Sequence, residues 1–191
     1  MPRSIQVYIW GWRGLGIEWG RVGHAMIADP STQTAILSQF PHKPGDPSVP
    51  YGPNTRLSYG DTYRAEGGQP DAIFGLSIAD ADCAAFDAAC ADHLARPFWD
   101  WDPAPPTQTH CARSCYDALV AGGIPIDPAG DYVILPGQTN EILPNSLWSL
   151  LAQTYATPVL VSRAGLNPAD LQALEDGVVA KRDKAGDPGP A

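Results

Sequence analysis

The chain has 191 residues, 44% of them hydrophobic and 17% charged, which suits one globular domain with a core of its own. Its 12 basic and 21 acidic residues give a net charge of -9, so we expect no nucleic-acid partner. No stretch approaches the ~20 apolar residues of a membrane span, and the N-terminus lacks the apolar core of a signal peptide, so we expect a chain made in the cytoplasm without membrane insertion.

The first half of the chain alternates between strand signals and turn signals. β-Branched and aromatic residues predict strands over 5–10, 21–29 and 34–40, with a turn at 30–33. Residues 41 to 71 carry six prolines and five glycines, and we expect no regular element there. A loop of this length is either a surface excursion or a functional segment, such as one that covers a cleft.

The second half adds helices around one strand. A strand is predicted over 72–78, and then a helix over 81–96 with Asp80 as its N-cap. Three more helices and a last strand are predicted over the following ranges: a helix from about 109 to 121, a helix over 144–153, a strand over 157–163 and a helix over 167–182. Clustered early strands followed by helices indicate an α+β domain over 1–184, with a flexible tail over 185–191.

The four cysteines do not form a disulfide framework, because they are few and their spacing is helical. Cys83 and Cys90 share one helical face with Phe86 and Leu94, which predicts that this face is buried. No CxxC pair is present, so we expect reduced thiols.

Cys111 lies in the first turn of its predicted helix, and Cys115 lies one turn later. The first amides of a helix have no helical partner and its N-terminal end is partly positive, which favours a thiolate at Cys111. The free N–H of Cys111 also suits an oxyanion. We therefore expect Cys111 to be a nucleophile with a lowered pKa that iodoacetamide labels first, at pH 6, and we expect Cys115 to fill the core.

A cysteine nucleophile needs a base, and the chain has four histidines. His42 lies in the proline-rich segment, and His93 is expected on a helix surface as an ordinary cation. His110 adjoins Cys111, but neighbouring helical residues point about 100° apart. His24 follows Gly23 at the start of an apolar strand, so it is the preferred base, with a half-buried structural histidine as the alternative.

Three segments resemble the circularly permuted branch of the papain-like NlpC superfamily of cysteine hydrolases. They are GRVGHAMIAD at 20–29, TAILSQFP at 34–41 and THCARSCYDALVAGG at 109–123, and LPNSLWSLL at 143–151 resembles the segment that follows in bacterial members. His110 stands where this family usually has asparagine.

The resemblance implies a fold and a catalytic arrangement. It implies a small antiparallel sheet packed against helices, with the nucleophile at a helix N-terminus. Cys111 would attack a carbonyl, His24 would hold its proton about 3–4 Å from the sulfur, and a third polar residue would orient the ring. That residue is Ser38 or Gln39, of which only one can face the site because adjacent strand residues point to opposite sides.

The resemblance also implies a function, with alternatives. The leading hypothesis is an amidase or endopeptidase that cuts peptidoglycan peptides, as an antibacterial effector delivered by a contact-dependent (type VI) secretion system to the target periplasm and met there by an immunity protein. The same Cys–His pair could serve a lipid acyl hydrolase or acyltransferase, or a protein deamidase. Non-enzymatic alternatives are an inactive interaction domain, or a metal-binding module using His24, Cys111 and Cys115. No cofactor and no catalytic metal are expected, and the tryptophans are placed either along a cleft or in the core.

Overall fold

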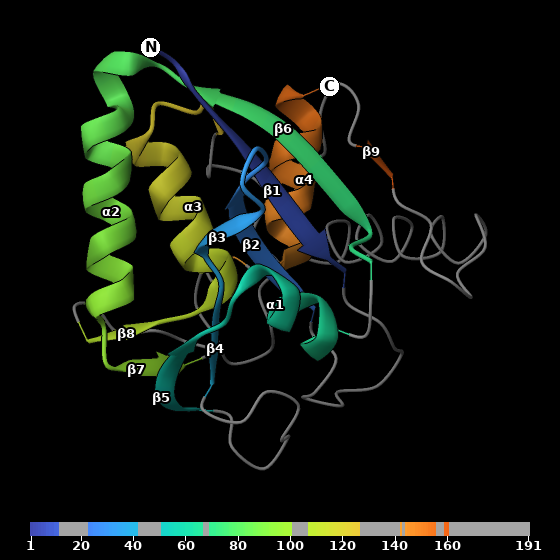
Figure 1. Ribbon diagram of the computed structural model, residues 1–191, viewed down its shortest axis with the longest axis vertical. Coiled ribbons are helices and arrows are strands. Elements are labelled where there is room, and N and C mark those ends of the chain that lie inside the picture. Colours follow the sequence, from blue (N-terminus) through green and yellow to red (C-terminus); the bar gives the residue numbers. More distant parts are fainter. Residues whose placement is uncertain are drawn as a thin grey trace, which may run out of the picture.

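A computed structural model of the chain describes residues 1–11, 23–41, 51–66, 69–100, 107–126, 142, 144–155 and 159–160. The predicted helix over 167–182 and the tail over 185–191 lie outside the described residues, as do Trp12, Trp19 and Trp101. Within the described ranges the chain forms a mixed α+β structure, as the sequence predicts (Figure 1).

The larger sheet has five strands in the order β3-β2-β1-β6-β9, and every neighbouring pair is antiparallel. Its strands are β1 (Arg3–Trp10), β2 (His24–Asp29), β3 (Thr34–Leu37), β6 (Ala72–Ile78) and β9 (Val159–Leu160). β1 pairs with β2, with Trp10 opposite His24, and the strand predicted after the turn at 30–33 pairs with β2 through β3. The predicted strand over 34–40 divides into β3 and β4, and Ser38 is the residue between them.

A second, smaller sheet has the order β4-β5-β7-β8, with a parallel pair between its last two strands. Its strands are β4 (Gln39–Pro41), β5 (Tyr51–Arg56), β7 (Phe98–Asp100) and β8 (Gln108–Thr109). The expectation that residues 41 to 71 hold no regular element is therefore wrong. That segment forms β5 and, after it, a short helix.

Four α-helices accompany the sheets in the described ranges: α1 (Tyr59–Ala65), α2 (Cys83–Ala95), α3 (Cys111–Ala121) and α4 (Pro144–Thr154). Asp80 does not cap α2 as predicted, because a 3-10 turn, η2 (Asp80–Asp82), comes first. α3 ends where the sequence predicts: Gly122 is its C-cap and Gly123 has a φ of +70°, a conformation that favours glycine. No helix of the described part of the chain is long and apolar enough to cross a bilayer.

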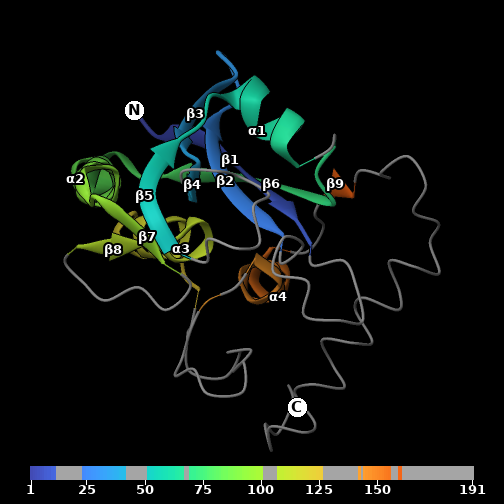
Figure 2. The same cartoon turned by 90° about the horizontal axis from the view of Figure 1, so that it is seen from below.

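The helices cover both faces of the larger sheet, as the view along the layers shows (Figure 2). α2, α3 and α4 pack on one face, over a core that includes Phe74, Phe86, Leu119 and Leu147. α1 lies on the other face, where Tyr59 and Tyr63 pack against a smaller cluster that contains Trp10. Strand alternation supplies a buried set of side chains to each face, which explains why β1 and β2 are apolar along most of their length.

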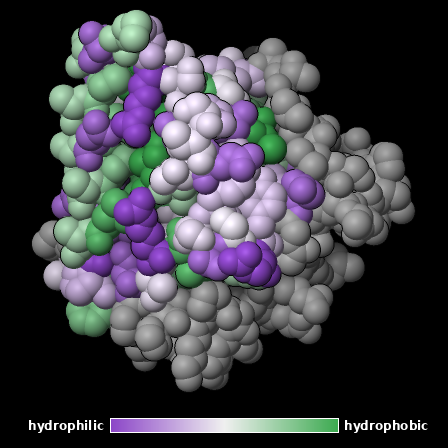
Figure 3. Space-filling view, viewed as in Figure 1, coloured by the Kyte–Doolittle hydropathy of each residue, from purple (hydrophilic) through white to green (hydrophobic). Residues whose placement is uncertain are grey.

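The exposed residues of α2 are mostly small alanines, together with Asp87 and Asp92. Its exposed alanines are Ala84, Ala85, Ala88, Ala91 and Ala95. They form the pale green band that follows α2 along the left edge of the space-filling view (Figure 3). Alanine has the highest helix propensity, so these residues favour the helix itself. The predicted buried face is confirmed: Phe86 and Cys90 are buried, and Cys83 and Leu94 pack against the core.

Candidate functional site

Cys111 is the first residue of α3 and so lies in the first turn, as the sequence predicts, although the helix begins two residues later than the predicted start near 109. His110 is the N-cap, and its Nδ1 accepts a hydrogen bond from the backbone N–H of Arg113 at 3.2 Å. The carbonyl of His110 accepts the N–H of Ser114, the first bond of the helix. Two other N–H groups of the first turn, those of Cys111 and Ala112, stabilise the thiolate form of Cys111. The sequence thus places a thiol among the unpaired amides of a helix start.

The start of α3 lies beside the start of β2. The backbone amide of Ala25 stabilises the Cys111 thiolate, and that of Ile27 does the same for Cys115. Four helical residues advance about 6 Å, and two strand residues advance nearly the same distance. This match lets the two thiols, one turn apart, meet two amides that are two residues apart. It also places Cys111 next to the residue that follows His24.

The backbone conformation of Gly23 determines how the chain enters β2 at His24. Its φ is +83°, and a Cβ atom there would lie 2.1 Å from the carbonyl oxygen of Trp10. Both the backbone conformation and the close approach of β1 therefore require glycine. In the Gly23-His24 pair, the backbone therefore requires the glycine, and the histidine is the candidate catalytic residue.

The His24 ring is enclosed by aromatic rings and hydroxyl groups. It stacks on Phe40 with centroids 4.0 Å apart, and it lies 5.9 Å from the Trp10 ring. Its Nε2 lies 3.1 Å from Ser38 Oγ, which in turn lies 2.6 Å from Thr62 Oγ1 in α1. Trp10 is fully buried here and belongs to the core.

Ser38 and Gln39 point to different partners, as strand alternation requires. Ser38 reaches His24, whereas the Gln39 amide nitrogen donates to the carbonyl of His93 at 2.7 Å. The main-chain carbonyl of Gln39 accepts from Trp99 Nε1 at 3.2 Å, and Trp99 is buried. Of the two candidates, Ser38 is therefore the one in contact with His24.

His93 is buried, so the expectation of a surface cation is wrong. Its Nδ1 lies 2.8 Å from Thr109 Oγ1 and its Nε2 lies 3.1 Å from Asp117 Oδ2. Burial raises the pKa of Asp117, but the hydrogen bond with His93 and the contacts of Arg113 Nε with both carboxylate oxygens outweigh it, so this pKa lies below its usual value. This network ties α2 to the segment that leads into Cys111. We interpret the Thr109–His93–Asp117 set as structural, because it joins α2 to α3 and to the strand before Cys111.

The two central residues are nearly inaccessible, and this determines their protonation. Cys111 is 3% exposed and His24 is 2% exposed. Burial raises the pKa of Cys111 to about 12, outweighing the amides that favour the thiolate. Burial lowers the pKa of His24 to about 3. The lowered cysteine pKa expected from the helix start is thus wrong for this state, in which a neutral thiol accompanies a neutral imidazole.

This correction reverses the expected order of alkylation. In native protein at pH 7, we expect iodoacetamide to label Cys83 first, because it is the one cysteine that is not fully buried. Cys111 should react slowly, since the thiolate is the reactive form and burial suppresses it. Peptide mass spectrometry after timed quenching measures each site. Labelling of Cys111 ahead of Cys83 at pH 6 would show that the helix start outweighs burial.

Thr62 is the contact of this site that the sequence does not reveal. It lies in α1, within the segment for which no regular element is predicted. The signal that could have revealed that helix is Ser58, three residues before Asp61, which is a helix-start pattern. In the structure Ser58 is the N-cap of α1 and accepts from the N–H of Asp61.

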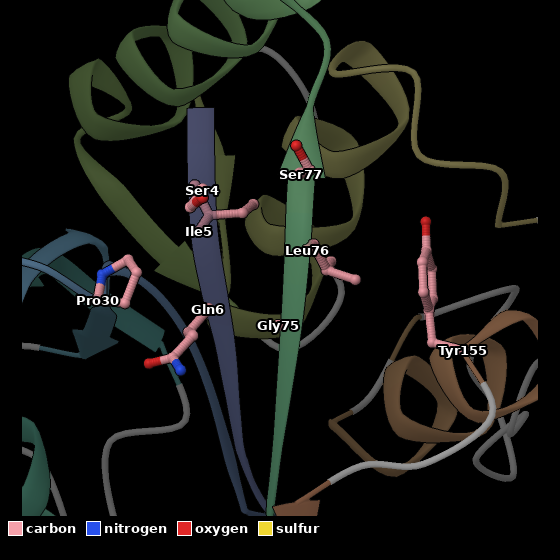
Figure 4. A pocket seen from close by; sticks show the side chains of 8 residues that line it. All are labelled: Ser4, Ile5, Gln6, Pro30, Gly75, Leu76, Ser77 and Tyr155. Atoms are coloured by element: carbon pink, nitrogen blue, oxygen red, sulfur yellow. The ribbon is translucent and has the colours of Figure 1, made fainter. Parts of the chain in front are cut away.

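Two other kinds of site find no support in the described part of the chain. It holds no group of three or more histidine, cysteine or acidic residues placed to bind a metal ion, so His24, Cys111 and Cys115 do not form a metal centre. A hollow of about 520 Å³ lies against β1 and β6, with Tyr155 facing it from beyond α4 (Figure 4). Its lining is Ser4, Ile5, Gln6, Pro30, Gly75, Leu76, Ser77 and Tyr155. These residues include no cysteine, histidine or carboxylate.

Compared with known proteins, the chain matches no family model, no curated protein and no solved structure.

Proposed function

We propose that the chain is a cysteine hydrolase of amide bonds with a circularly permuted papain-like fold. Cys111 is the nucleophile, His24 is the general base and Ser38 orients the base. The observation that supports this most is the meeting of the α3 start with the β2 start, which places the Ala25 amide at the Cys111 thiol while His24 binds Ser38. The three residues come from separate parts of the sequence, and the fold brings Ser38 to His24 and the thiol of Cys111 to the residue that follows His24.

The neutral pair supports a mechanism in which proton transfer accompanies attack. His24 takes the thiol proton as Cys111 Sγ bonds to the substrate carbonyl carbon, and the carbonyl oxygen becomes an oxyanion. The N–H groups at the start of α3 can stabilise that oxyanion. The imidazolium then gives its proton to the leaving amine. Water hydrolyses the resulting thioester, with His24 again acting as base, and this step restores the thiol.

Access of substrate to this pair requires movement, because both residues are buried in the described state. Phe40 lies directly on the His24 ring and is among the side chains that must shift or form a wall of the site. Exclusion of water by these rings keeps the electrostatic interactions inside the site strong.

Peptidoglycan peptides are the substrate that we propose. A Cys–His pair attacks carbonyl carbons, whereas glycosidic bonds call for paired carboxylates. Among carbonyl substrates, wall peptides are favoured by the resemblance of residues 20–29, 34–41 and 109–123 to bacterial wall hydrolases. In this proposal the protein is an antibacterial effector that acts in the target periplasm, delivered by secretion machinery and countered by an immunity protein.

The test is digestion of isolated peptidoglycan by the purified chain, followed by chromatography and mass spectrometry of the products. We expect fragments with new amino and carboxyl termini and intact sugars. A parallel incubation with phospholipid vesicles tests the lipid alternative, and incubation with glutamine-rich proteins tests deamidation. Intact wall fragments together with released fatty acid or ammonia would replace the amidase proposal by the corresponding alternative.

A further inference from the structure

The histidine of the candidate site ends a chain of three hydrogen bonds that begins at a backbone carbonyl. Thr62 Oγ1 lies 2.8 Å from the carbonyl oxygen of Ser58. Ser38 Oγ lies 2.6 Å from Thr62 Oγ1, and His24 Nε2 lies 3.1 Å from Ser38 Oγ. Ser38 and Thr62 are buried, so their hydroxyl protons must be shared within this chain.

The direction of the chain follows from its first member. A carbonyl oxygen only accepts, so the Thr62 hydroxyl donates its single proton to Ser58. Thr62 Oγ1 must then accept from Ser38, and Ser38 Oγ must accept from His24. The ring therefore carries its proton on Nε2, and its lone pair lies on Nδ1.

If the hydrogen bonds ran in the opposite direction, from Thr62 towards His24, the bond to the Ser58 carbonyl would be lost. If Ser38 donated to His24 Nε2 and Thr62 donated to Ser38, no proton would lie between Thr62 Oγ1 and the Ser58 carbonyl. Two oxygen atoms, one of them on the buried Thr62, would then face each other at 2.8 Å without a proton between them, which is unfavourable.

We propose that Thr62 is a positioning residue that selects the tautomer of His24, holding the proton on Nε2 and leaving Nδ1 as the base. The tautomer itself is a property of the fold. Its catalytic consequence rests on the proposed function, in which Nδ1 receives the proton of Cys111. The tautomer matters because burial keeps the ring neutral, so one nitrogen alone can act as base.

The position of Thr62 is well determined by its helix. Its backbone N–H and its hydroxyl both bond to the carbonyl of Ser58, at 2.9 Å and 2.8 Å. Ser58 is itself fixed as the N-cap of α1 through the N–H of Asp61. A threonine rotamer that bonds to the carbonyl four residues earlier is common in helices, and here it leaves the oxygen lone pair directed at Ser38.

The tautomer is measured directly by ¹⁵N–¹H correlation spectra of the histidine rings, with a His24→Gln spectrum assigning the His24 signals. In the wild type we expect the proton on Nε2. Thr62→Val keeps the shape but removes the acceptor, so Ser38 turns to donate to Nε2 and the proton moves to Nδ1. Thr62→Ser keeps the hydroxyl and should keep the wild-type tautomer.

Activity on wall fragments gives a second readout. Thr62→Val should lower kcat by about 10²-fold or more with little change in KM, by analogy with the loss that follows a wrong histidine tautomer. Thr62→Ser should restore it to within about threefold, since the hydroxyl can still accept from Ser38. If Thr62→Val does not fold, Thr62→Ala provides the same spectroscopic comparison.

Two results overturn the proposal: a wild-type ring with its proton on Nδ1, or a proton that stays on Nε2 when the Thr62 hydroxyl is removed. Failure of the proposed function is distinguishable, because a chain without hydrolase activity still reports the tautomer. If the tautomer changes as expected while wall fragments stay intact, Thr62 keeps its role and the substrate proposal is what fails.

Discussion

Cys111→Ala is expected to abolish amide hydrolysis, with a loss of at least about 10³-fold in kcat, whereas Cys115→Ala should retain most of the activity. The two thiols make a matched pair. Both are buried in α3, and each meets a backbone amide of β2. Only Cys111 lies in the first turn, beside the residue that follows His24. Release of wall peptides, measured against enzyme concentration, compares the two variants.

Stability must be followed with activity in this comparison. Removing one buried sulfur leaves a small cavity, and we expect each variant to lose about 1 kcal/mol of unfolding free energy. Urea unfolding at pH 7 shows whether both variants remain folded during the assay. Equal activity losses in the two variants, at equal stability, would contradict the assignment of Cys111 as nucleophile.

The parts of the fold that sequence predicts best are those in which one local pattern has a single meaning. The strand over 72–78 agrees with β6 to the residue, because its ends are defined by a proline-containing turn and an acidic turn. Cys111 in a first turn follows from the helix end at Gly122 and a helix of ordinary length. His24 at a strand start follows from Gly23, whose backbone conformation only glycine adopts readily.

Tertiary contacts override the local pattern elsewhere. Prolines and glycines in 41–71 hide β5, a strand that is defined by its pairing with β4 and β7 and not by its own composition. His93 looks like a surface cation on its helix, but Thr109 and Asp117 arrive from later in the chain to bind it. The pKa of Cys111 is a third example. The helix start, which favours a low pKa, can be predicted from local sequence, but the burial that raises the pKa depends on the whole fold.

Stability should depend on pH through His24 more than through any exposed group. Burial lowers the pKa of this ring to about 3 from its ordinary 6.5. Between these two values the unfolded chain binds a proton that the native chain excludes, so stability falls as the pH decreases from 6.5 towards 3. At pH 4 the loss amounts to roughly 3 kcal/mol, a large part of the stability of a small domain.

His24→Gln isolates this effect, because glutamine can still donate to Ser38 and does not titrate. The carboxylates and the other histidines are present in both proteins, so their contributions cancel in the difference between wild type and variant. We expect the wild type to lose roughly 3 kcal/mol more than the variant between pH 7 and pH 4, measured by urea unfolding at several pH values. Parallel curves across this range would mean that the native ring takes up a proton, and that the His24 site is open to water in the folded protein.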